Sequence, residues 1–95
     1  MLFHIQCVDR TDAGTTRPDT RPAHLVFLEK FVPQIITSGP LLSAEGKPFG
    51  SVFVIDFPNE AAARQFCADD PYAKAGLFAS TTITRFRQVY PSARE

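Results

Sequence analysis

The histidine in the stretch RPAHLVFLEKF, residues 21–31, is the side chain best suited to acid–base chemistry in this sequence. Its neighbours follow the spacing of an amphipathic helix, Thr20 suits a cap, and Pro22 suits a first turn. We therefore expect a helix that begins near Arg21, with His24 in its first turn. The positive end of a helix favours the neutral imidazole, which is the form that acts as a base. A histidine that borders an apolar face is more often a structural residue, so both roles stay open.

A second candidate is one of two adjacent carboxylates, Asp69 and Asp70, which precede Pro71. The simpler interpretation is that Asp70 caps a short helix whose first residue is Pro71, while Asp69 is a solvated charge. The functional interpretation places Asp70 beside His24, where a carboxylate would orient the imidazole or share its proton-transfer work. Sequence spacing does not decide between them.

Three further residues are candidates for binding a substrate. Tyr72 could present its hydroxyl to the same cleft or pack as an ordinary aromatic residue. Arg21 could bind an anionic group or lie solvated at the start of the helix. Ser51 falls on an apolar strand face, where its buried hydroxyl needs a partner, although a backbone carbonyl would suffice.

Motifs for metals and common cofactors are missing from the sequence. His4, Cys7, His24 and Cys67 form no CxxC or HxxxH pair, so we expect no metal site. No GxGxxG, GxxxxGK[ST] or GxSxG motif occurs, which argues against nucleotide cofactors and against a serine hydrolase. Any reaction would therefore be free of cofactors.

Charge and hydropathy exclude two classes of partner. Ten Lys and Arg residues balance ten Asp and Glu residues, so no excess charge attracts nucleic acid or an anionic membrane. No apolar run reaches the ~20 residues that span a bilayer, and the N-terminus lacks the pattern of a secretory signal. We expect a cytoplasmic protein in which Cys7 and Cys67 are free thiols.

The elements that must position these residues follow from periodicity and turn signals. Residues 2–8 and 49–57 alternate as strands do, and residues 9–20 read as a long polar loop. Leu25, Leu28 and Val32 form an apolar helical stripe that Phe27 and Phe31 widen, and Pro33 ends or kinks the helix. The other expected elements are a strand in QIITSGPLLS, a helix capped by Asn59 in EAAARQFCADD, a short helix in PYAKAG and a last strand in LFASTTITRFRQVY.

This order predicts an α+β ferredoxin-like fold, βαββαβ, formed by a single domain over residues 1–95. Its four-stranded antiparallel sheet would carry both helices on one face. If the helices cover Phe49, Phe53 and Ile55, the other face still carries Val52 and Val54, and an uncovered apolar face marks an interface. We expect a homodimer that stacks sheet on sheet.

Several motifs in this order resemble the YciI-like, or YCII-related, family: RPAHL at 21–25, SGPLL at 38–42, GSVFVIDF at 50–57 and ADDPYAKAGLF at 68–78. The resemblance covers nearly the whole chain and implies the dimeric α/β-barrel arrangement of ferredoxin-like domains. It also implies a His-Asp pair at the active site, which falls on His24 and Asp70. One branch of the family is associated with dehydrochlorination of chlorinated hydroxyquinols, and the fold relatives include muconolactone isomerases.

Two hypotheses for function follow. In the first, the protein is a small cofactor-free enzyme of lyase or isomerase type, in which His24 moves a proton and Asp70 orients it, with Arg21, Tyr72 and Ser51 around a small cyclic or aromatic oxygenated substrate. In the second, the same dimer is a non-catalytic module that binds a small molecule or a partner. Contact between His24 and Asp70 in an accessible pocket would favour the enzyme.

Overall fold

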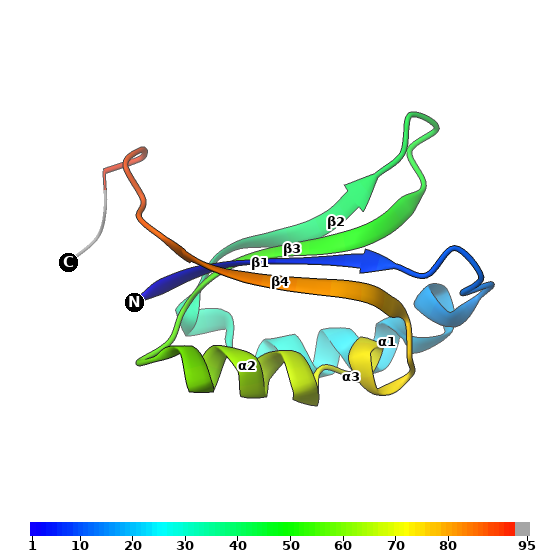
Figure 1. Ribbon diagram of the computed structural model, residues 1–95, viewed down its shortest axis with the longest axis horizontal. Coiled ribbons are helices and arrows are strands. Elements are labelled where there is room, and N and C mark those ends of the chain that lie inside the picture. The colour runs from blue at the N-terminus through cyan, green and yellow to red at the C-terminus, as the bar shows by residue number, and fades with distance from the viewer. Residues whose placement is uncertain (93–95) are drawn as a thin grey trace.

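The computed structural model describes residues 1–92 and contains one four-stranded sheet with helices on one side of it (Figure 1). The strands are β1 (Leu2–Asp9), β2 (Ile35–Leu42), β3 (Pro48–Asp56) and β4 (Phe78–Phe86), and the helices are α1 (Thr16–Glu29), α2 (Glu60–Asp69) and the short α3 (Pro71–Lys74). A 3₁₀ turn, Val32–Gln34, links α1 to β2.

The strand order is β2-β3-β1-β4, and each neighbouring pair is antiparallel. The two central strands, β1 and β3, come from the two halves of the chain. The end of β1, where the connection through α1 begins, lies beside the start of β4, where the connection through α2 and α3 ends. In Figure 1, α1, α2 and α3 all lie below the sheet, and no helix within residues 1–92 covers its upper face. The predicted α+β ferredoxin-like topology is confirmed.

Aromatic rings fill the layer between helices and sheet. Phe66 of α2 lies within 5.5 Å, centroid to centroid, of four other rings, those of Phe27, Phe31, Phe53 and Phe57. Edge-to-face and tilted pairs of this kind add to the stabilisation that burial of apolar area provides. This cluster fixes α1 and α2 against β3 and so sets the separation of the side chains at their ends.

The predicted start of α1 was wrong. The helix begins at Thr16, so His24 lies about two turns inside it rather than in its first turn. The argument that the positive helix end favours a neutral His24 therefore does not apply. Pro18, in the first turn, loses no intrahelical hydrogen bond, whereas Pro22 lies inside the helix and is tolerated there.

The end of α1 agrees with the expectation that Pro33 ends the helix rather than kinks it, since α1 ends at Glu29 and Pro33 lies in the 3₁₀ turn that follows. The buried face of α1 differs from the prediction. Leu25 and Val32 are 42% and 55% exposed, whereas His24 is buried and Phe27, Leu28 and Phe31 pack on the core. The inward face thus begins at His24, and the histidine is part of the core-facing row.

The uncovered sheet face is more polar than its valines alone suggested. The registers place Val52 and Val54 of β3 on this face beside Gln6 and His4 of β1, with Thr82 and Thr84 of β4 alongside. Val54 is only 7% exposed because these neighbours cover it, whereas Val52 is half-buried. Phe86, also on this face, is 40% exposed.

Local signals in the second half of the chain were read correctly. Asn59 caps α2 by accepting a hydrogen bond from the Ala62 N–H at 2.8 Å, and Gly76 follows α3 with φ of 73°, a conformation that favours glycine. Cys7 and Cys67 are free thiols, as predicted. Within residues 1–92 no helix is both long and apolar enough to cross a membrane.

Candidate active site

His24 and Asp70 form a buried pair between α1 and the start of α3. Nδ1 of His24 lies 2.8 Å from Oδ1 of Asp70, and their side chains are 8% and 2% exposed. The same Asp70 oxygen accepts a hydrogen bond from the Tyr72 N–H at 2.9 Å. Asp70 is therefore both the cap of α3 and the partner of His24, so the two interpretations of this residue hold together. Asp69 instead accepts a hydrogen bond from Gln65 on α2, at 2.9 Å.

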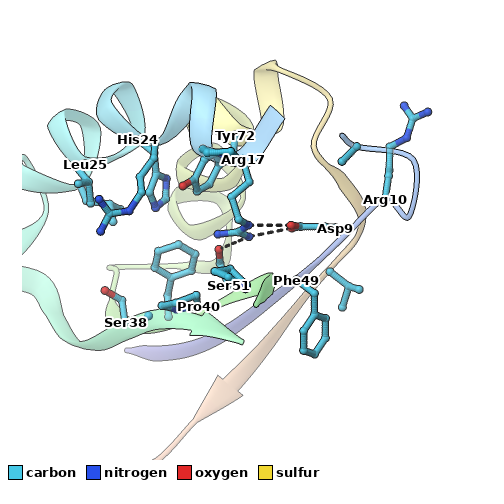
Figure 2. A pocket seen from close by; sticks show the side chains of 18 of the residues that line it. Asp9, Arg10, Arg17, His24, Leu25, Ser38, Pro40, Phe49, Ser51 and Tyr72 are labelled. Carbon is cyan, nitrogen blue, oxygen red and sulfur yellow. Dashed lines mark hydrogen bonds and ion pairs between the residues drawn. The ribbon is translucent and has the colours of Figure 1, made fainter. Parts of the chain in front are cut away.

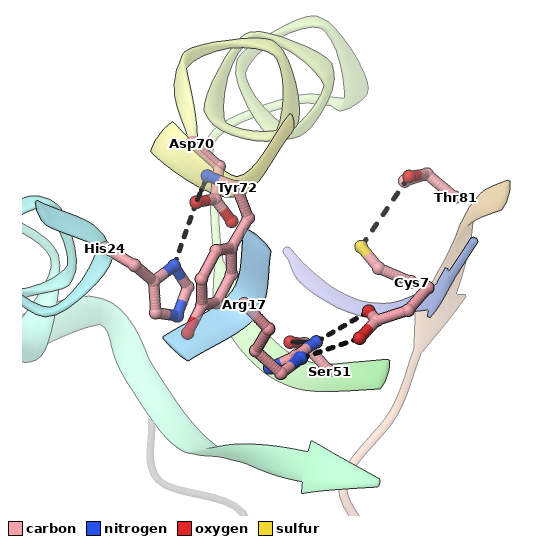
Figure 3. A network of polar contacts seen from close by, with 8 residues as sticks. Cys7, Arg17, His24, Ser51, Asp70, Tyr72 and Thr81 are labelled. Atoms are coloured by element: carbon pink, nitrogen blue, oxygen red, sulfur yellow. Dashed lines mark hydrogen bonds and ion pairs between the residues drawn. The ribbon is translucent and has the colours of Figure 1, made fainter. Parts of the chain in front are cut away.

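This contact determines how the imidazole presents itself. An ionised carboxylate only accepts hydrogen bonds, so we infer that Nδ1 of His24 carries a hydrogen and donates a hydrogen bond to Oδ1 of Asp70. In the neutral ring, Nε2 then holds the free lone pair. Figure 3 shows this second nitrogen on the side of the ring away from Asp70.

Tyr72 stacks on the imidazole and lies between it and an arginine (Figure 3). Its ring centroid is 3.9 Å from that of His24, with an angle of 20° between the planes, and the Arg17 guanidinium carbon is 4.7 Å from the Tyr72 centroid. Burial raises the pKa of the Tyr72 phenol, although Arg17 and Arg21 act to lower it. The phenol therefore keeps its proton at neutral pH and remains a hydrogen-bond donor.

Arg17 and Asp9 form a second ion pair at the same site, which the sequence interpretation missed because residues 9–20 were read as a loop. Nε and Nη2 of Arg17 each lie 2.8 Å from an Asp9 oxygen, and Nη2 also donates to the Ser51 hydroxyl at 3.0 Å. Burial acts to lower the pKa of Arg17, but the hydrogen bonds and charge of Asp9 outweigh it and raise that pKa. The buried Ser51 hydroxyl, for which a backbone carbonyl would have sufficed, thus has the Arg17 guanidinium as its partner.

These side chains line a cleft of about 790 Å³ between α1, the end of β1 and the β2–β3 hairpin (Figure 2). From α1 it receives Arg17, Arg21, His24 and Leu28, which share one helix face at spacings of four, three and four residues. The sequence predicts this shared helix face only if α1 begins at Thr16, because a helix that begins near Arg21 leaves Arg17 outside it. Arg21 is exposed, Ser51 and Phe53 form part of the floor, and Tyr72 completes the wall.

All five residues that the sequence singled out line or support this cleft: His24, Arg21, Ser51 and Tyr72 line it, and Asp70 lies behind His24. The volume falls in the range of ~300–1,000 Å³ that small-molecule sites have. Within residues 1–92, no three His, Cys, Asp or Glu side chains gather closely enough to hold a metal ion.

Comparison with known proteins places the chain in a family. A family model described as the YCII-related domain matches residues 1–87. The chain belongs to the YCII-related family. Protein YciI of Escherichia coli O6:H1 is 28% identical over 98 residues, which cover 95% of this chain and 100% of that protein.

Among solved structures, this YCII-related chain is similar to 5-chloro-2-hydroxyhydroquinone dehydrochlorinase from Burkholderia phenoliruptrix AC1100, in complex with 2,5-dihydroxybenzoquinone. The TM-score is 0.88 at 34% identity, over 92% of this chain and 94% of the dehydrochlorinase. SnoaB, a cofactor-independent oxygenase from Streptomyces nogalater, has a TM-score of 0.57 at 17% identity, over 95% and 96% of the two chains. The second likeness extends to the fold alone.

Proposed function

We propose that this YCII-related protein is a cofactor-free acid–base enzyme that catalyses an elimination or isomerisation on a small, oxygenated, cyclic substrate. The observation that carries the proposal is the 2.8 Å contact between His24 and Asp70 at the wall of the cleft. A base oriented by a buried carboxylate is the arrangement that general base catalysis needs. Such chemistry requires only positioned proton donors and acceptors.

In an elimination, Nε2 of His24 takes a proton from the substrate while the leaving group departs with the electron pair of its bond to carbon. For a chlorinated ring, that leaving group is chloride, and the net change is loss of HCl without oxidation or reduction. Asp70 holds the ring and stabilises the imidazolium that forms. The imidazolium then returns its proton to water. In an isomerisation, the same imidazolium returns the proton to a different carbon of the substrate.

The rest of the cleft suits a flat substrate with several oxygens. Phe53 and Leu28 supply apolar contacts, while Arg21 and the Tyr72 hydroxyl are donors for ring oxygens. The dehydrochlorinase at 34% identity, which binds a dihydroxybenzoquinone, supports this substrate class. It makes hydroxylated or chlorinated aromatic rings the first compounds to test.

The test is chloride release and product formation from 5-chloro-2-hydroxyhydroquinone under anaerobic conditions, with lactone isomerisation followed by NMR in parallel. The wild-type protein should turn over one of these substrates, and His24→Asn should lower kcat by about 10²- to 10⁴-fold. His24→Gln serves as a second variant, and circular dichroism reports whether each variant folds. Binding of 2,5-dihydroxybenzoquinone with no turnover of any substrate would favour a non-catalytic binding module instead.

We also propose that the protein acts as a homodimer in which two copies stack through the sheet face opposite the helices. That face carries Val52 and Phe86, both accessible, and no other element of the described chain covers it (Figure 1). An apolar face left in water is stabilised by pairing with a second copy of itself. The cleft lies on the opposite, helix-covered side and remains open in this arrangement.

A further inference from the structure

Asp9 and Ser51 hold the Arg17 guanidinium through two of its three nitrogens, Nε and Nη2. Within residues 1–92, the one further polar contact of the guanidinium is with the Tyr72 hydroxyl, and this contact acts to raise the pKa of Arg17. In that part of the chain, every fully buried side-chain nitrogen or oxygen has a partner. Nη1 is therefore not sealed in the core, and the accessible space beside Arg17 is the cleft.

The Tyr72 hydroxyl and Nε2 of His24 are accessible from the cleft for the same reason as Nη1 of Arg17. Within the described chain, Nε2 of His24 has no hydrogen-bond partner and the Tyr72 hydroxyl contacts only the Arg17 guanidinium. Neither atom is buried without a partner. Both residues line the cleft. Figure 3 shows the hydroxyl and the free ring nitrogen directed away from Asp70, while the Arg17 guanidinium lies on the other face of the Tyr72 ring. The three polar atoms thus belong to three stacked side chains that form one wall of the cleft.

The two carboxylates near this wall, those of Asp9 and Asp70, are already engaged in hydrogen bonds with protein groups. Asp9 directs both oxygens to Arg17, and Asp70 is engaged with His24 and with the Tyr72 N–H. The cleft also receives Arg21, which forms no ion pair with residues 1–92, and Arg10, whose charge is paired with Asp12 at 2.9 Å. The groups open to a ligand near His24 are therefore donors and cations, with the lone pair of His24 as the exception.

We propose that Nη1 of Arg17 and the Tyr72 hydroxyl form an oxyanion site, which binds a phenolate or enolate oxygen of the ligand beside Nε2 of His24. Asp9 is the positioning residue that holds the guanidinium flat and fixed, so little rotational freedom is lost when a ligand binds. The cleft therefore selects oxygenated rings that are anionic or that become anionic when His24 removes a proton. A role of this oxyanion site in catalysis rests on the proposed function. The preference for anions, in contrast, concerns ligand binding and can be measured without turnover.

The test compares two quinones that differ in charge, by isothermal titration at neutral pH. The probes are 2,5-dihydroxybenzoquinone, whose acidic hydroxyls ionise, and 2,5-dimethoxybenzoquinone, whose oxygens are methylated and neutral. Wild-type protein should bind the anion at least ~10-fold more tightly, and Arg17→Gln should weaken anion binding by about 10- to 100-fold, as loss of a charged hydrogen bond does. Binding of the neutral quinone should change by less than about 3-fold, since that quinone offers no charge to the guanidinium.

Controls separate this inference from the proposed enzyme activity. Arg64→Gln on α2, an exposed arginine paired with Glu60, is a matched change that should leave binding of both quinones unaltered. His24→Asn should retain the anion preference even though it lowers kcat. If Arg17→Gln does not fold, Tyr72→Phe should still reduce the preference.

Two outcomes would overturn the oxyanion site. Equal affinity of the wild-type protein for the two quinones is one, and it needs no variant. An equal loss for both quinones in Arg17→Gln is the other, because it would mean that Arg17 only supports the shape of the cleft. A protein with anion preference but no turnover would contradict the enzyme proposal alone.

Discussion

Nδ1 of His24 and Oδ1 of Asp70 lie 2.8 Å apart although 46 positions separate the residues in the chain. The contact joins the inward face of α1 to the cap of α3, and both side chains are almost fully buried. Burial of an unpaired carboxylate is costly, so the histidine stabilises the position of Asp70 as much as Asp70 orients the histidine. A structural and a chemical role therefore coincide in one hydrogen bond.

Asp70→Asn should separate these two roles. Asparagine caps helices about as well as aspartate, so α3 and the melting temperature should change little. An amide does not stabilise an imidazolium or hold the required tautomer, so we expect kcat to fall by about 10²- to 10⁴-fold. Asp69→Asn is the matched control, because the side-chain hydrogen bond of Asp69 within residues 1–92 is with Gln65 rather than with His24, and kcat should stay within about twofold of wild type. Equal rates for the two variants would remove Asp70 from the mechanism.

Asp9→Asn should destabilise the fold more than loss of an exposed ion pair. The side chains of Arg17 and Asp9 are only 12% and 11% exposed, and the substitution leaves the guanidinium without its counter-charge. We expect a loss of about 2–4 kcal/mol in the free energy of unfolding, measured with urea. Glu60→Gln breaks the exposed pair with Arg64 and should cost less than about 1 kcal/mol. Similar losses in both variants would contradict this ranking.

The two thiols should make stability fall at alkaline pH. Burial raises the pKa of Cys7 from 9.0 to about 11 and that of Cys67 to about 12. The folded protein therefore holds these protons more tightly than the unfolded chain, so this stabilisation is complete below pH 9.0 and is lost as the pH rises toward 11 and 12. Urea unfolding across this range should show the decline. Cys67→Ala should reduce its slope, and an unchanged slope would show that other groups cause it.

Thiol labelling provides a second measure of the same burial. At pH 8 a thiol reagent should modify the folded protein slowly and the urea-unfolded chain rapidly, because the thiolate is the reactive form and is scarce in the fold. Rapid labelling of the folded protein would indicate that the thiols are more open than the structure has them.

Val52→Lys should convert the proposed homodimer into monomers. A lysine on the uncovered sheet face places a charge at the centre of the stacked sheets, where pairing would leave it desolvated. Light scattering coupled to size exclusion should report the monomer mass, whereas wild-type protein should elute as a dimer. Gln65→Lys on exposed α2 is the control and should remain dimeric. A monomeric wild-type protein would contradict the dimer directly.

Local sequence patterns predicted the topology and most of the second half of the chain. Alternation located β3, Asn59 marked the start of α2, and Asp70 with Pro71 marked α3, because each signal depends on neighbours only a few residues away. The pairing of His24 with Asp70 was an explicit hypothesis, since both residues stand out as chemically unusual for their surroundings. The predicted start of α1 near Arg21 is wrong, because Pro22 resembles a first-turn proline but lies within the helix.

The element order and the chemical groups available to the cleft follow from the amino-acid sequence. Which of these groups come into contact depends on how the elements pack together. The end of β1 brings Asp9 to Arg17, so the ion pair joins two segments that spacing alone assigns to a loop. Arg17 lies on the same face of α1 as His24, and its guanidinium packs against the ring of Tyr72. Periodicity reports the faces of single elements, whereas this site forms where strand, helix and cap converge, and packing of the aromatic core sets that convergence.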